Sequence, residues 1–151
     1  EERGDLYVCG MFSWAGSRHA PGCFHRVRYA GKPAHLPIGL KSASQQVQLS
    51  FSHPLTRASA EDITLYELSA WDLRRTPNYG SDHYNERDLV VTAASLSADG
   101  KTVTLSVPQL SPTWGMSIEY NLVGRNGREF RGEIHNSIHN LPPQFGQDAP
   151  R

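Results

Sequence analysis

The sequence predicts an all-β protein built as an antiparallel β-sandwich, and three features of the chain support this. Apolar and polar residues alternate with a period of two in several short stretches, whereas no stretch keeps the 3.6-residue period of an amphipathic helix. The 13 glycines and 10 prolines interrupt the apolar stretches about as often as these occur. Two dipeptides that favour tight hairpin turns, Asp99-Gly100 and Asn126-Gly127, lie between alternating stretches.

Length and charge narrow the class of protein. A chain of 151 residues forms one ordinary domain, or a small domain with an appendage, and buries a core without metal or disulfide bonds. Its 15 Lys and Arg residues balance 15 Asp and Glu residues, so no basic excess attracts nucleic acid. No segment approaches the ~18 apolar residues of a membrane span. Because the chain starts at Glu1 with neither an initiator Met nor a signal peptide, we expect a processed product or a fragment.

The first part of the chain predicts a strand pair followed by a linker. Residues 5–10 and 23–31 are rich in β-formers and flank a loop that contains Gly and Pro. A lone hairpin is marginal in water, so this one must pack on something. Residues 31–39 contain two prolines and predict an extended linker or an edge segment.

The remaining strands follow in order. Residues 46–51 are the clearest strand, and residues 59–62 predict one helical turn capped by Thr56 or Ser59. Two further strands are expected within residues 63–75, and the two Gly-tipped hairpins complete about seven strands between residues 45 and 138. We therefore expect an N-terminal hairpin segment at 1–35, a β-sandwich at 36–141 and a flexible tail at 142–151.

Several segments resemble those of bacterial immunoglobulin-like domains. These are "VQLSFSHPLTRASAEDITLYEL", "VTAASLSADGKTVTLSVPQLSPTWGMSIEYNLVG" and the "NG" that follows, within residues 38–141. The resemblance implies an immunoglobulin-like antiparallel β-sandwich with an N-terminal strand pair, and it says little about function.

The whole chain resembles, more narrowly, the C-terminal region of planctomycete and verrucomicrobial multidomain haem-binding proteins of the cytochrome c type. The matching segments are "DLYVCGMFSWAG", "PGCFHRVRYAGKPAHLPIGL", "WDLRRTPNYGSDHYNERDL", "PTWGMSIEY" and "IHNSIHNL". The resemblance implies an exported protein, periplasmic or secreted, in which the first ~30 residues end a β-propeller. The haem would be held by a separate module, because this chain lacks the cytochrome module; we expect no cofactor in this chain.

The two cysteines, Cys9 and Cys23, leave two alternatives open. They can form one disulfide, which would close a loop worth ~3 kcal/mol, or they can be free thiols packed in a core. The chain has no CxxC or CxxCH motif, so a thioredoxin-like redox site and covalent c-type haem attachment are not encoded.

Three histidines are candidate metal ligands. His135 and His139 are spaced by four residues, which on a helix would aim both imidazoles at one ion. A strand over residues 129–135 that then turns at Asn136 fits better, and in a strand the two would lie about 13 Å apart. His83 lies in the polar segment 75–89 beside carboxylates. Structural histidines are the alternative.

Aromatic residues outside the expected strands are candidates for contacts with a ligand or a partner. Tyr79 and Tyr84 lie in the polar segment 75–89, and exposed aromatic loops often dock onto partner surfaces. Trp14 and Trp114 lie beside glycines in expected loops and could stack on a sugar. Trp71 lies inside an expected strand, so we expect it in the core.

The sequence favours a noncatalytic accessory or interaction domain. No GxSxG, HExxH or P-loop motif is present. The expected partners are neighbouring domains of a larger exported protein, with no nucleic acid and no membrane span. The alternatives are a carbohydrate-binding module that uses exposed Trp residues and recognises a polysaccharide, and a metal-binding β-sandwich that uses the histidines.

Overall fold

A computed structural model describes residues 4–11, 22–31 and 34–146 of the chain. The chain divides into two compact units, residues 1–33 and residues 34–151. None of the helices in the described ranges is long and apolar enough to cross a membrane.

The first unit is an antiparallel pair of strands, β1 (Leu6–Met11) and β2 (Gly22–Val27), as the sequence predicts. The rings of Tyr7 and Phe24 stack on one face with their centroids 5.7 Å apart. Phe24 is nevertheless 73% exposed, and most of the other apolar side chains of this strand pair are also exposed. A two-stranded ribbon with so little burial has no core of its own.

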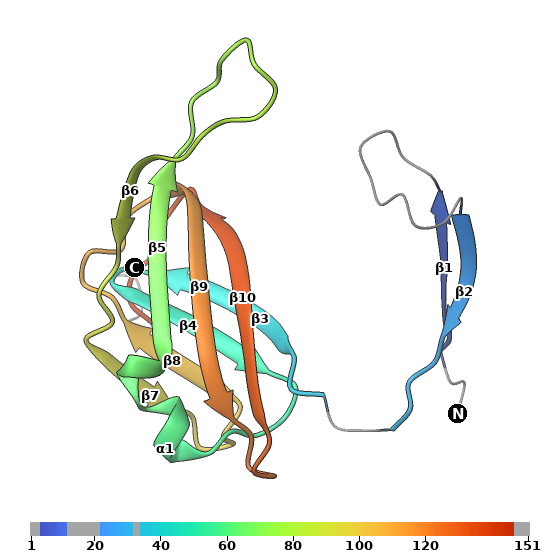
Figure 1. Ribbon diagram of the computed structural model, residues 1–151. Helices are drawn as coiled ribbons and strands as arrows, with labels where there is room; N and C mark the ends of the chain where they lie inside the picture. The colour runs from blue at the N-terminus through green and yellow to red at the C-terminus, as the bar shows by residue number, and fades with distance from the viewer. Residues whose placement is uncertain (1–3, 12–21, 32–33, 147–151) are drawn as a thin grey trace. The chain divides into compact units, whose positions relative to one another are not determined.

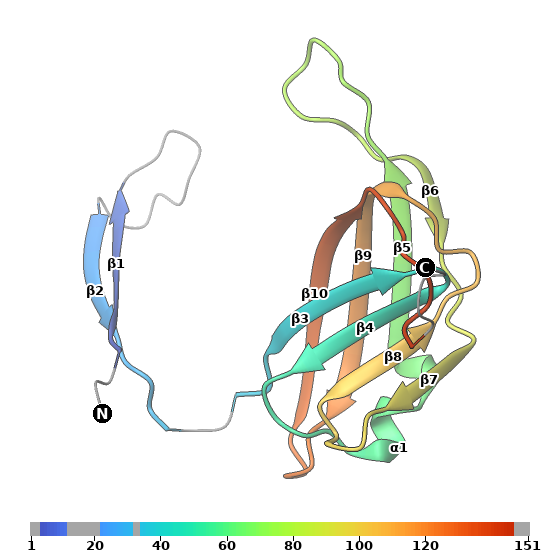
Figure 2. The same cartoon turned by 180° about the vertical axis from the view of Figure 1, so that it is seen from behind.

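The second unit is a β-sandwich of two four-stranded antiparallel sheets, which confirms the predicted fold class (Figure 1). One sheet has the order β3-β4-β8-β7 and the other has the order β10-β9-β5-β6. Figure 2 gives the view from behind, in which the two sheets again lie face to face. The strands are β3 (Pro37–Ala43), β4 (Gln46–Phe51), β5 (Tyr66–Asp72), β6 (Tyr84–Asp88), β7 (Ala93–Leu96), β8 (Thr102–Ser106), β9 (Thr113–Val123) and β10 (Glu129–Ile138).

The core lies between the two sheets and follows from the period-two pattern. Alternate residues of β4, β8 and β9 are fully buried, among them Leu49, Leu105 and Ile118, because each strand turns every second side chain inward. Phe51 meets Tyr120 edge to face across the core, with ring centroids 5.4 Å apart. The expected strand at 46–51 and both Gly-tipped hairpins are confirmed.

Two local expectations need correction. The region predicted as two strands within residues 63–75 begins with a short 3-10 helix, η1 (Ile63–Leu65), and continues as the single strand β5. The predicted helical turn is present as α1 (Arg57–Ala60), but the Thr56 hydroxyl does not cap it, because it donates to the carbonyl of Val123 instead. The segment predicted as a linker or edge, residues 31–39, leads into β3, which is an outermost strand of its sheet, so the edge alternative is confirmed.

The C-terminal part of the sandwich also differs from the prediction. Strand β10 does not turn at Asn136, because it continues to Ile138 through a register shift between these two residues. The beginning of the predicted tail is held by hydrogen bonds. Ser44 N–H donates to the carbonyl of Pro142 at 2.7 Å, and Phe145 N–H donates to Gln46 Oε1 at 3.0 Å.

Candidate functional site

Trp71 forms the centre of an aromatic cluster on the outer face of the sheet β10-β9-β5-β6. Its neighbour Ala70 belongs to the core, so the alternation of β5 turns Trp71 away from the core, contrary to the expectation from sequence. The cross-strand partner is Gly115, and a Cβ at that position would collide with the indole. Trp71 is still only 8% exposed, because the imidazole of His83 stacks flat on it at 4.0 Å between ring centroids.

His135 joins this cluster from strand β10. Its ring meets Trp71 edge-on at 6.1 Å, and its Nε2 lies 3.0 Å from Glu133 Oε1. The Ser117 hydroxyl donates to the same carboxylate oxygen at 2.8 Å. On the other side, His83 Nδ1 lies 3.6 Å from Glu86. Two of the three predicted metal ligands therefore surround one indole, and each has a carboxylate beside it.

The third predicted ligand, His139, lies elsewhere. It follows the end of β10 and meets Trp114 edge to face at 5.8 Å between ring centroids. In the described part of the chain, no group of three or more His, Cys, Asp and Glu side chains is arranged to hold a metal ion. The structure therefore does not bring His83, His135 and His139 together, and metal binding by any of them stays a prediction.

The polar segment predicted at 75–89 contains strand β6 and most of a loop, residues 73–83, that extends beyond the ends of β5 and β6 (Figure 1). Every residue of this loop is exposed, and Tyr79 is fully so. The base of the loop is fixed: the Arg74 guanidinium lies 4.2 Å above the centre of the Tyr84 ring, and Arg74 N–H donates to Ser81 Oγ at 2.9 Å. Of the two predicted tyrosines, Tyr79 is free and Tyr84 is half-buried.

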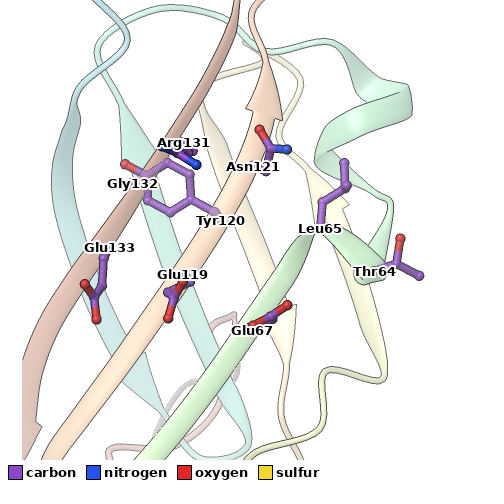
Figure 3. Close-up of a pocket in the computed structure, with 9 residues that line it drawn as sticks. All are labelled: Thr64, Leu65, Glu67, Glu119, Tyr120, Asn121, Arg131, Gly132 and Glu133. Carbon is purple, nitrogen blue, oxygen red and sulfur yellow. The ribbon is translucent and has the colours of Figure 1, made fainter.

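Three carboxylates lie side by side on the same outer face, as Figure 3 shows. Glu119 of β9 lies directly opposite Glu67 of β5 and directly opposite Glu133 of β10. They line a shallow groove together with Arg131 and Asn121. Like charges placed opposite one another destabilise a sheet. This row was missed from sequence because it requires the register of three strands that are far apart in the chain.

A second cluster lies where the sandwich begins. The ring of His35 stacks on Phe130 at 4.8 Å and lies against Gly124, and His53 lies 5.5 Å away. His35 Nδ1 is buried without a hydrogen-bond partner. Burial lowers the pKa of His35, and nearby His53 and Arg128 lower it further. This cluster anchors the residues before β3 and was not predicted from the sequence.

Cys9 is a free and exposed thiol in the structure, so it does not pack in a core. Its register partner in β2 is Phe24, whereas the backbone of Cys23 lies opposite Gly10. The side chain of Cys23 and the whole of Trp14 lie outside the described residues, so their predicted roles stay predictions.

Comparison with known proteins finds similar solved structures at low sequence identity. No family model and no curated protein matches the chain. Among solved structures, the surface layer protein SbsC (domains 1–6) is 17% identical with a TM-score of 0.44, over 64% of this chain and 12% of that one. The copper resistance protein PcoC from Escherichia coli is 14% identical with a TM-score of 0.47, over 64% and 85%. CopC from Methylosinus trichosporium OB3b is 15% identical with a TM-score of 0.36, over 71% and 84%.

The chain covers only about an eighth of the surface layer protein. None of these structures reaches a TM-score of 0.5, so the fold assignment rests on the strand order and register. Fold and site together define an antiparallel β-sandwich domain in which one sheet carries an aromatic cluster, a row of carboxylates and a long exposed loop.

Proposed function

We propose that this chain is a noncatalytic interaction domain of an exported multidomain protein, and that loop 73–83 is its docking element. One observation carries the proposal: Tyr79 is fully exposed on a loop whose base is held in place. Tyrosine is enriched in protein–protein interfaces, because a rigid ring provides contact area at a low cost in side-chain entropy.

The contacts at the base of the loop explain how it would be preorganised. His83 closes one end of the loop by stacking on Trp71, and Arg74 closes the other end through Tyr84 and Ser81. A segment that is already ordered loses less conformational entropy on binding than a free one. Arg75 is also exposed on this loop, so its guanidinium would offer a charged group to a partner in addition to the Tyr79 ring.

We base the proposed location and partners of the domain on the resemblance of its sequence to multidomain haem-binding proteins. We therefore propose neighbouring domains of the same protein as the partners, in the periplasm or outside the cell. In such a protein the haem would lie on a separate module. No residue of this chain is assigned to haem binding. The role of this domain would be to fix the position of the other modules.

The test is site-specific photo-crosslinking in the intact parent protein. A benzophenone amino acid at position 79 should crosslink to another domain, because the ring at this position would lie in the contact. The matched control is position 98, which is exposed beside the Asp99-Gly100 turn at another loop of the sandwich. Crosslinking at position 79 no stronger than at position 98 would contradict the proposal.

A second candidate function is carbohydrate binding at Trp114. This indole is 59% exposed and has the His139 ring edge-on beside it, so one face is available for stacking on a sugar. Titration with several polysaccharides should then change the tryptophan emission of the native chain and leave that of Trp114→Phe unchanged. An unchanged emission of the native chain with every glycan would remove this candidate.

A further inference from the structure

The four outermost strands of the sandwich are unequally suited to pair with another strand. Strand β3 begins with a proline and has a register shift, β7 has four residues, and β6 has five residues with Asn85 at φ 51°. Natural sheets protect their edges with such short, bulged or proline-containing strands. Strand β10 has ten residues and no proline, and it keeps a continuous register with β9 from Glu129 to Asn136.

The solvent-facing side chains of β10 alternate in charge. They are Glu129, Arg131, Glu133 and His135, and all four are exposed. The side chains between them, such as Phe130 and Ile134, pack against the core. The edge of β10 thus carries a regular charge pattern on one face and apolar residues on the other.

We propose that two copies of this chain pair antiparallel along β10, with Gly132 of one copy opposite Gly132 of the other. In this register Arg131 lies opposite Glu133, and Glu129 lies opposite His135. The two-fold symmetry forms each of these pairs twice. Opposite charges placed directly across a strand pair stabilise it.

Charge disfavours the two adjacent registers. Centring the two-fold axis on Arg131 would place arginine opposite arginine, and centring it on Glu133 would place glutamate opposite glutamate. The Gly132 register also aligns Phe130 with Ile134 on the inner face. The product would be a continuous eight-stranded sheet built from two copies of β10-β9-β5-β6. This proposal goes beyond the docking role of loop 73–83 and does not depend on it.

The experiment is analytical ultracentrifugation of the full chain over a range of concentrations. The native chain should show a reversible monomer–dimer equilibrium, because pairing along one edge forms a small interface. The variant Glu133→Arg places two arginine pairs at the centre and should raise the dimer Kd by about tenfold or more. The double variant Arg131→Glu with Glu133→Arg restores opposite charges and should restore the native Kd.

The matched control is Glu67→Arg, which makes the same change of charge on the same outer face but two strands away from the edge. Its dimer Kd should stay within about twofold of native. As a second readout, hydrogen exchange of the β10 amides should slow as the protein concentration rises, because the pairing protects them.

Several results would overturn the proposal. One is a native chain that remains monomeric at the highest concentration reached. Another is a dimer that Glu133→Arg does not weaken, or that Glu67→Arg weakens equally. A double variant that stays as weak as Glu133→Arg would also overturn it, because the charge pairing would then not be the cause.

Discussion

The two sheets of the sandwich have similar inner faces and different outer faces. The sheet β3-β4-β8-β7 carries mainly uncharged side chains on its outer face, with Lys41 opposite Gln48. There Gln48 Nε2 donates to Thr104 Oγ1 at 3.1 Å, and Ser50 Oγ lies 3.1 Å from Thr102 Oγ1. The sheet β10-β9-β5-β6 carries Trp71 under its histidines and the carboxylate row. Because the core needs only the inner faces, the outer faces can differ without altering the fold, and we expect recognition on the second sheet.

The largest predicted difference between the sheets comes from one glycine in each. At Gly115 a Cβ would overlap the indole of Trp71, whereas at Gly39 it would meet Ser50 Cβ at 3.4 Å. Gly115→Ala should therefore lower the free energy of unfolding by about 1–3 kcal/mol, as expected for overpacking. Gly39→Ala should change it by less than about 0.5 kcal/mol. Urea unfolding measures both, and equal effects would show that Trp71 does not depend on the glycine.

A smaller effect is predicted for the His83 imidazole that covers Trp71. His83→Ala removes the stacked ring, so the free energy of unfolding should fall by about 0.5–1.5 kcal/mol, and the tryptophan emission should shift to longer wavelength. Thr104→Ala on the sheet β3-β4-β8-β7 is the control and should leave the emission unchanged. An unshifted emission in His83→Ala would mean that this imidazole does not shield the indole.

A still smaller effect, of opposite sign, is predicted for the carboxylate row. Glu119→Gln removes the central charge of the row, so it should stabilise the fold by about 0.2–1 kcal/mol at low salt. Salt screens exposed charges, so the gain should shrink at about 0.5 M NaCl. Thermal unfolding at two salt concentrations measures this. A gain that is independent of salt would exclude charge repulsion as its cause.

The smallest effect concerns pH at the start of the sandwich. The pKa of His35 is lowered from its ordinary value of 6.5, first by burial. The unfolded chain therefore takes up this proton more readily than the folded chain, and stability falls as the pH drops below about 6.5. His35→Phe preserves a ring on Phe130 but cannot titrate, so its loss of stability between pH 7.5 and 5.5 should be smaller than that of the native chain. Equal losses would contradict this role.

The sequence was sufficient to predict the strands and turns that depend on the local pattern of residues. The alternation in residues 46–51 and the turns at Asp99-Gly100 and Asn126-Gly127 led directly to the sandwich. The site depends on contacts between distant segments, and these could not be predicted. Trp71 looked like a core residue because its strand pattern does not show that Gly115 leaves space for it on the outer face.

The structure also groups the predicted histidines differently, for a related reason. Spacing in the sequence grouped His135 with His139, but β10 continues past Asn136 and separates their surroundings. His135 lies instead beside Trp71, with His83 on the same indole, although these residues are far apart in the chain. A glycine opposite a tryptophan within two predicted strands is the one signal that could have indicated this cluster.

The difference between the sheets can be tested most directly by NMR. A ¹⁵N-labelled sample of the chain would be titrated with the neighbouring domains of its parent protein, and the shift changes would be mapped onto the two sheets. We predict that they concentrate on loop 73–83 and the adjoining outer face around Trp71. Changes concentrated on the sheet β3-β4-β8-β7, or no changes at all, would contradict the assignment of recognition to the charged sheet.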